Sequence, residues 1–233
     1  MAGVALALLT AGCGGGSEVA GVGPRVTETA PAKGDADSSA ATTALDSPKI
    51  ADLRARARLA SCPGPERGSA GQAAGEQSAT DERQAVVGAD ASRRPLPDVT
   101  LACLGSGPDV ALGQLKGPAV LNLWAQWCPP CRKEAPHFQA LHEQAGDQLL
   151  VLGIDYDDPR PDLALALAAD LGLRYPQVVD ADKKLLAPFG MFVGLPATVF
   201  VDADGRIAHV VHRPYRSEQQ LRQDVRTYLG VTW

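Results

Sequence analysis

The distribution of aromatic side chains is the feature that most restricts how this chain can fold. The chain has 233 residues, yet every Phe, Trp and Tyr lies after residue 120, the first being Trp124. Aromatic side chains bury large apolar areas, so a segment without them has little material from which to build a core. We therefore predict that the folded domain spans 95–233.

An apolar run, Ala2–Ala11, stands at the N-terminus and leads into Cys13. Ten helical residues extend about 15 Å, half of what is needed to cross the hydrocarbon core of a bilayer. The run instead has the length of the apolar part of a secretory signal. Small residues followed by a cysteine resemble a bacterial lipobox. We predict a signal and lipobox over 1–13 with lipidation at Cys13, the alternative being a frayed apolar terminus.

The next segment, 14–49, is rich in Gly, Ala, Ser and Thr. Such a composition cannot bury enough apolar surface to offset the entropy lost on ordering the chain. We predict a disordered linker here. A flexible coil of about 35 residues reaches about 30–35 Å, which suits a tether that holds a domain away from a membrane.

Segment 50–94 is predicted to hold one short helix followed by a flexible stretch. Ile50–Leu59 places its apolar residues on one helical face, and either Asp46 or Ser47 can cap its N-terminus. A Pro- and Gly-rich sequence after Cys62 ends the helix. Low-complexity sequence then continues up to the domain.

The domain itself alternates between strand and helix patterns, which predicts an α/β sandwich with a mixed sheet. A hairpin is expected near its end because Asp202-Ala203-Asp204-Gly205 is a strong turn signal. The predicted strands are Asp98–Leu104, Pro118–Trp124, Leu149–Ile154, Pro196–Val201 and Ile207–Val211. The predicted helices are Pro129–Ala145, Pro161–Leu171 and Ser217–Leu229.

The segment Trp124–Cys131, WAQWCPPC, connects a buried strand to a helix. A cysteine at a helix N-terminus meets unpaired backbone N–H groups and the positive end of the helix dipole, which favour the thiolate. Cys128 is therefore the expected nucleophile. Cys131 lies one turn deeper, where it can close a disulfide with Cys128 and release a substrate from the mixed disulfide.

A Cys-x-x-Cys pair can also be half of a zinc site, but zinc needs two further ligands. The sequence has no second Cys-x-x-Cys, and its four histidines do not form a suitably spaced pair: His137, His142, His209 and His212. We therefore predict a redox site and no metal site.

The motif W-x-x-W-C-x-x-C in Trp124–Cys131 resembles the active site of the thioredoxin superfamily, and its flanks resemble the TlpA/ResA-like branch. The resemblance covers about 95–230 and includes Pro136 in the helix and Gly194–Thr198 before the hairpin. It implies a thioredoxin fold with a central mixed sheet, and a protein-disulfide reductase that needs no cofactor.

The resemblance implies a role for Glu134, because ResA-like proteins carry an acidic residue three positions after the second cysteine. Its carboxyl group would exchange a proton with the thiol of Cys131. Thioredoxin itself uses an Asp on the preceding strand, where this chain has Asn122. The alternative is a solvated helix carboxylate beside Arg132 and Lys133.

The same resemblance implies that Pro196 is the family's cis-proline. A cis bond there would place the backbone of Leu195 against the sulfur atoms, where it could pair with a substrate strand. We expect Trp127 to shield the disulfide and to contact the substrate, whereas Trp124 is expected in the core.

Two isolated cysteines, Cys62 and Cys103, each lie beside the end of a predicted element. In an oxidising compartment such a pair indicates a structural disulfide, which would staple the short helix to the first strand of the domain. The alternative is two unpaired buried thiols.

Together these inferences predict an extracytoplasmic thiol–disulfide oxidoreductase, anchored to the outer face of the bacterial cell membrane as a lipoprotein. The resemblance implies that it reduces disulfides in protein substrates, in the maturation of cytochrome c or copper sites, with electrons from a membrane thiol reductase. A net charge of −5 without a basic stripe argues against nucleic acid as a partner.

Two rival functions use the same fold. A peroxiredoxin-type peroxidase needs a P-x-x-x-T-x-x-C frame, and residues 121–128 have neither that Pro nor that Thr. A copper-binding chaperone of the Sco kind needs C-x-x-x-C plus a His, and this chain has one residue fewer between its cysteines.

Overall fold

A computed structural model describes residues 45, 47–64 and 93–233. Several predictions concern residues outside this part: the signal and lipobox with Cys13, most of the linker, and most of the flexible stretch after the short helix. None of the helices in the described part is long and apolar enough to cross a membrane.

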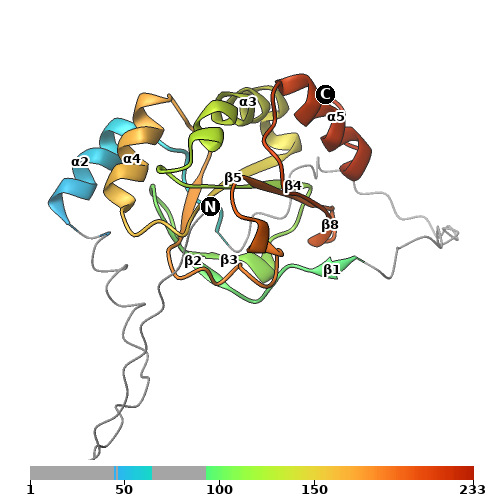
Figure 1. The fold of residues 1–233 in the computed structure, drawn as a ribbon, viewed down its shortest axis with the longest axis horizontal. Coiled ribbons are helices and arrows are strands. Elements are labelled where there is room, and N and C mark those ends of the chain that lie inside the picture. The colour runs from blue at the N-terminus through green and yellow to red at the C-terminus, as the bar shows by residue number, and fades with distance from the viewer. Residues whose placement is uncertain (1–44, 46, 65–92) are drawn as a thin grey trace, which may run out of the picture. The chain divides into compact units, whose positions relative to one another are not determined.

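A mixed sheet of eight strands, in the order β1-β8-β7-β4-β5-β6-β2-β3, forms the centre of the domain (Figure 1). The neighbours β4, β5 and β6 run parallel, whereas β7 and β8 on one side and β2 on the other are antiparallel to their partners. The strands are β1 Arg94–Pro95, β2 Thr100–Cys103, β3 Val110–Ala111, β4 Ala119–Trp124, β5 Leu150–Tyr156, β6 Gln177–Asp180, β7 Ala197–Val201 and β8 Arg206–Val211.

Four helices cover one face of this sheet. Figure 1 shows α2 beside α4 at one end of the layer and α3 beside α5 at the other. The helices are α2 Pro48–Ala57, α3 Pro129–Ala145, α4 Pro161–Asp170 and α5 Glu218–Leu229, and the short 3₁₀ turns are η1 Leu112–Gln114, η2 Gly146–Gln148 and η3 Met191–Val193.

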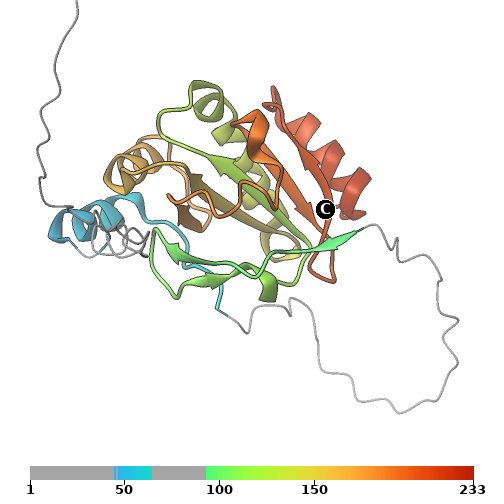
Figure 2. The ribbon, with the colours of Figure 1, turned by 60° about the horizontal axis from the view of Figure 1, so that its bottom comes forward.

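The alternation of side chains along β4 divides the core into two layers. Val120 and Trp124 point into the cluster formed with the four helices. Leu121 and Leu123 point the other way, into a second cluster that includes Leu101 and other residues of the β2–β3 region. Figure 2 shows this region on the side of the sheet away from the helices. Because β4 is buried on both faces, it reads as a continuous apolar run.

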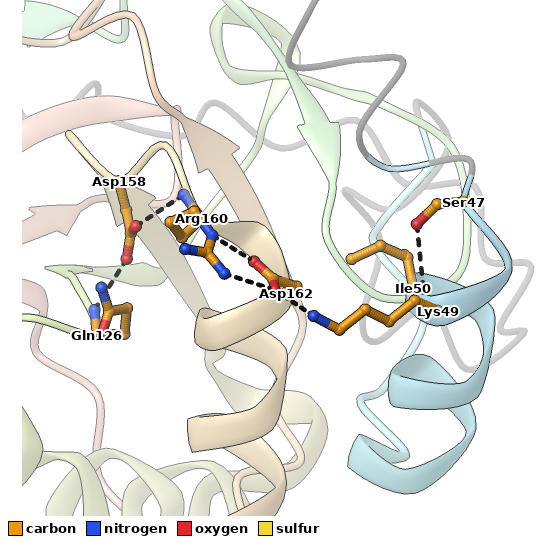
Figure 3. Close-up of polar contacts among 7 residues, drawn as sticks. All are labelled: Ser47, Lys49, Ile50, Gln126, Asp158, Arg160 and Asp162. Atoms are coloured by element: carbon orange, nitrogen blue, oxygen red, sulfur yellow. Dashed lines mark hydrogen bonds and ion pairs between the residues drawn. The ribbon is translucent and has the colours of Figure 1, made fainter.

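The short helix α2 begins at Pro48, two residues before the predicted start at Ile50. Ser47, one of the two expected caps, is its N-cap, and its hydroxyl accepts a hydrogen bond from the Ile50 N–H (Figure 3). It ends at Ala57, two residues earlier than predicted, because Arg58 adopts a left-handed conformation with φ 50°. The apolar face of α2 packs against α4 and belongs to the helix-side core. Lys49 adds an ion pair to Asp162 of α4 at 2.7 Å.

Consequently α2 is a part of the folded domain that we predicted to begin at Pro95. The domain also takes in Arg94, which pairs with Ile207 of β8 through strand β1. Two features explain why the sequence did not indicate this: α2 is too short to show where it docks, and β1 has only two residues.

Candidate active site

Cys128 and Cys131 form a disulfide at the N-terminus of α3, with Cα atoms 5.4 Å apart. Cys128 is the N-cap residue, and its Sγ accepts a hydrogen bond from the Cys131 N–H at 3.3 Å. Pro129 and Pro130 occupy the first turn, where a missing N–H costs least. The arrangement thus directs a helix N-terminus at the sulfur of Cys128.

The turn before Cys128 is held by contacts on both sides. The Cys128 N–H donates to the Ala125 carbonyl at 3.1 Å, which closes the turn. The Gln126 N–H donates to Asp158 Oδ2 at 3.1 Å, and the Gln126 carbonyl accepts from Arg132 Nε at 2.7 Å. These bonds fix the backbone that presents Cys128.

The two tryptophans of the motif have different surroundings. Trp124 is buried, and its indole N–H donates to Gln177 Oε1 at 2.9 Å. Trp127 is 48% exposed beside Cys128, and its indole N–H donates to the Asp157 carbonyl at 3.1 Å. Trp127 therefore offers an apolar surface next to the disulfide.

Glu134 is fully buried on the same face of α3 as Cys131, one turn further along. Its Oε2 accepts a hydrogen bond from the Tyr215 N–H at 2.8 Å, and its Oε1 accepts from Asn122 Nδ2 at 3.2 Å. The Tyr175 hydroxyl donates to Asn122 Oδ1 at 3.3 Å. Burial raises the pKa of Glu134 to about 7, despite the opposing effect of these hydrogen bonds. A carboxyl group with such a pKa can take up and release protons near neutral pH.

The Leu195–Pro196 peptide bond is cis, and Pro196 is buried directly before β7. Because β7 pairs antiparallel with β4 and Ala197 stands opposite Leu123, Pro196 and Leu195 lie along the end of β4 that leads to the active-site turn. The residues just before them, Phe192 and Val193, are each 76% exposed. An exposed apolar segment therefore precedes the cis bond.

A second disulfide joins Cys62 and Cys103, whose Cα atoms are 6.1 Å apart. Both cysteines are buried. The hydrogen bonds around this bridge involve backbone groups. The Cys62 N–H, for example, donates to the Ser106 carbonyl at 2.7 Å. The bridge connects the segment that follows α2 to the end of β2.

Within the described part of the chain, no three side chains of the His, Cys, Asp and Glu types converge as metal ligands. His142 is half-buried against Tyr175, and His209 stacks on Tyr228 with ring centroids 4.1 Å apart. These two histidines thus have packing partners.

The fold and the site together define a class: this is a thioredoxin-fold protein with a Cys-x-x-Cys disulfide at the start of the helix that follows the central strand. The chain belongs to the AhpC/TSA family, whose model matches residues 93–210.

Comparison with known proteins supports this class. The chain is 31% identical over 117 residues to the thiol-disulfide oxidoreductase ResA of Bacillus anthracis, a match that covers 48% of this chain and 65% of ResA. It is 38% identical over 104 residues to the thiol:disulfide interchange protein DsbE of Haemophilus influenzae, covering 43% and 51%. The chain thus spans between about half and two thirds of the length of these curated relatives.

Solved structures show the same fold. A DsbF homologue from Corynebacterium diphtheriae superimposes with a TM-score of 0.53 at 32% identity, covering 59% of this chain and 88% of the other. A secreted thiol-disulfide isomerase from Corynebacterium glutamicum gives a TM-score of 0.53 at 27% identity, covering 67% and 96%. The predicted thioredoxin fold and the resemblance to the ResA-like branch are confirmed.

Some residues around the site were not singled out from the sequence. Tyr215 reaches Glu134 from the segment between β8 and α5, and no motif marks it. Asp158, which holds Gln126, belongs to an acidic sequence after β5. The sequence did carry one signal for Asp158: acidic residues directly follow a buried strand, at the sheet edge where Cys128 lies.

Proposed function

We propose that this protein is an extracytoplasmic thiol–disulfide oxidoreductase that reduces disulfides in proteins. The observation that carries the proposal is the Cys128–Cys131 disulfide at the N-terminus of α3, with the buried carboxyl group of Glu134 one turn beyond Cys131. The names of the ResA and DsbE relatives support the same chemistry.

The reaction would begin from the dithiol form. The Cys128 thiolate attacks one sulfur of a substrate disulfide, and the other substrate sulfur leaves as a thiolate and takes up a proton. Cys131 then loses its proton and attacks the Cys128 sulfur of the mixed disulfide. The substrate leaves with both sulfurs reduced, and the protein is left with the Cys128–Cys131 disulfide, the form that the structure shows.

Glu134 is the group that we propose accepts the proton of the Cys131 thiol. It lies on the same buried face of α3, and its pKa of about 7 makes it a competent base near neutral pH. As Glu134 takes up the proton, no unpaired charge remains in the core.

The surface around Cys128 suits an unfolded or extended protein segment. Trp127 beside Cys128, and Phe192 and Val193 in the segment before the cis bond, expose apolar side chains. The backbone of Leu195 would pair with the substrate strand, in line with its position two residues before the start of β7.

The location and the electron donor are further parts of this proposal. A lipidated Cys13 followed by a linker would hold the domain at the outer membrane face, and a membrane thiol reductase would return the pair to the dithiol form. The Cys62–Cys103 disulfide supports an oxidising compartment, because structural disulfides persist there. Cytochrome c or copper-site proteins are the substrates to test first.

The test is a disulfide-reduction assay with the full chain, a protein substrate and a chemical reductant. Cys131→Ser should trap a mixed disulfide between Cys128 and the substrate, and Cys128→Ser should trap none. If Cys128→Ser reduces the substrate as fast as the wild type, the proposal is wrong. Labelling of Cys13 with a radioactive fatty acid in cells tests the anchor separately.

A further inference from the structure

Asp155, near the end of β5, is a fully buried carboxyl group to which the proposed reaction assigns no role. Side chains of β5 alternate, so Asp155 points toward the helices, between its neighbours Trp124 of β4 and Val179 of β6. Within the part of the chain that the structure describes, no N–H or O–H group donates a hydrogen bond to either of its oxygen atoms. Buried polar groups without a partner are rare, so this carboxyl group needs an explanation.

The carboxyl group that faces Asp155 is that of Asp158, three residues further along, which is also fully buried. Both Asp158 oxygens are occupied: Oδ2 accepts from the Gln126 N–H at 3.1 Å and Oδ1 from the Arg160 N–H at 3.0 Å (Figure 3). Asp158 thus joins the active-site turn to the start of α4.

Asp155 and Asp158 differ in the hydrogen bonds that they accept, and this difference determines which of the two carboxyl groups holds a proton. Two backbone N–H donors stabilise Asp158 as a carboxylate, whereas an ionised Asp155 would be a buried charge beside another of the same sign. Two carboxylates cannot hydrogen-bond to each other, but a protonated Asp155 can donate to Asp158. Burial, and then the charge of Asp158, raise the pKa of Asp155 well above its usual range.

Among the described residues, no side chain packed around the pair offers a cation to Asp155. The α4 residues on the buried face are Ala164, Leu165 and Ala168. The guanidinium group of Arg160 is exposed and bonds Asp162, which also binds Lys49 of α2 (Figure 3).

The other buried carboxyl groups have partners of their own. Glu134 on α3 accepts from Asn122 and Tyr215. Asp180 at the end of β6 accepts from the N–H groups of Lys184 and Leu185. Of the carboxyl groups in the described ranges, Asp158 is therefore the one that can share the proton of Asp155.

We propose that Asp155 and Asp158 share one proton beneath the turn that carries Cys128, and that Asp155 is a positioning residue for this nucleophile. By donating to Asp158, Asp155 holds the carboxylate that binds the Gln126 N–H. The inference rests on the proposed function, since it takes Cys128 to be the attacking residue. Loss of the shared proton at alkaline pH would drive the two carboxylates apart and release the turn.

The first experiment follows protonation in the oxidised protein, where no active-site thiol titrates. Aspartate side chains labelled with carbon-13 report the charge of each carboxyl group by NMR. The Glu134→Gln background removes a buried carboxyl group whose pKa is raised to about 7. We expect Asp155 to stay protonated at pH values at which an aspartate of ordinary pKa is ionised.

The second experiment replaces the proton donor. Asp155→Leu should speed amide exchange at Gln126 and slow the attack of Cys128 on a substrate disulfide by about 10- to 100-fold, since small misplacements of a reacting group have costs of this size. Asp155→Asn keeps an N–H donor, so it should retain both properties and lose the alkaline decline in rate. Asp147→Asn removes an exposed carboxyl group and serves as the matched control.

An ionised Asp155 at pH 6 would overturn the inference. So would an Asp155→Leu variant with unchanged Gln126 exchange and unchanged Cys128 reactivity. If Asp155→Leu does not fold, Asp158→Asn tests the same contact, because it removes one acceptor with little change in size. Titration and exchange need no turnover, so a wild-type protein that reduces no disulfide would reject the proposed function and leave this result standing.

Discussion

The two disulfides of this protein are the same chemical bond in different surroundings. Cys128 and Cys131 are three residues apart at a helix N-terminus, with the buried carboxyl group of Glu134 nearby and the half-exposed ring of Trp127 beside them. Cys62 and Cys103 are 41 residues apart, buried, and contacted by backbone carbonyl groups.

This comparison indicates that the groups around the cysteines, more than the burial of the cysteines, distinguish a reactive disulfide from a structural one. All four cysteines are at most 5% exposed. What distinguishes Cys128 and Cys131 is a helix N-terminus that stabilises a thiolate and a group that can exchange a proton. The Cys62–Cys103 bridge instead closes a long loop and fastens the segment after α2 to β2.

Loss of an active-site sulfur is the largest effect that we expect. Cys128→Ser should lower the rate of disulfide reduction by at least about 10³-fold, because the nucleophile is gone. A chemical assay with a protein substrate measures this. The double variant Cys62→Ser with Cys103→Ser should reduce the substrate disulfide at the wild-type rate. A large loss of this rate in the double variant would show that the Cys62–Cys103 bridge is more than structural.

Loss of the second bridge should instead affect stability. In the chain-entropy model, opening a loop of this length lowers the free energy of unfolding by about 4 kcal/mol. Urea denaturation of the double variant, with the active-site pair oxidised, measures the change. Mass spectrometry of unreduced peptides gives an independent check, and finding Cys62 and Cys103 as free thiols would show that the bridge does not form.

The stability should also depend on pH through Glu134, whose pKa rises from 4.5 to about 7 on folding. The folded state then binds the proton more tightly than the unfolded state. The free energy of unfolding should therefore fall as the pH rises from about 4.5 to 7, by roughly 3 kcal/mol if the full shift is realised.

Glu134→Gln has no such proton to lose, so its free energy of unfolding should fall less steeply than that of the wild type across this pH window. The same variant should shift the thiol titration of Cys131 in the reduced protein. A wild-type protein with equal stability at pH 5 and pH 7 would contradict the buried, proton-exchanging environment that separates the two disulfides.

The smallest effect that we expect concerns α2, which both its N-cap and the neighbouring bridge stabilise. Ser47→Ala removes the acceptor of the Ile50 N–H and should cost about 1 kcal/mol. Thermal unfolding of the two proteins measures the difference, with Ser47→Asp as a control that retains a capping oxygen. No loss in the alanine variant would mean that α2 is held by its packing and the bridge alone.

Much of the fold could be predicted because its signals are local. Helix α3 has the predicted bounds Pro129–Ala145, since Cys128 and two prolines mark its start. The hairpin of β7 and β8 follows from the Asp- and Gly-rich turn, in which Gly205 has φ 78°. These patterns need no knowledge of the rest of the chain.

Other features depend on contacts between distant segments. Strand β6, Gln177–Asp180, was not predicted: it has four residues, all buried, and two of them are polar. Gln177 is placed in the core by Trp124, whose indole N–H it accepts, and no local pattern shows this. The Tyr215 and Asp158 contacts to the active site arise in the same way, because each depends on how loops meet at the edge of the sheet.

The most direct test of the account is a redox titration of the full chain that follows both disulfides by mass spectrometry. If the protein is a reductase, the Cys128–Cys131 pair should have a reduction potential near that of thioredoxin, about −270 mV. The Cys62–Cys103 bridge should be reduced only below about −300 mV, as structural disulfides are. A value near −120 mV for Cys128–Cys131 would indicate an oxidase and contradict the proposed direction of electron flow.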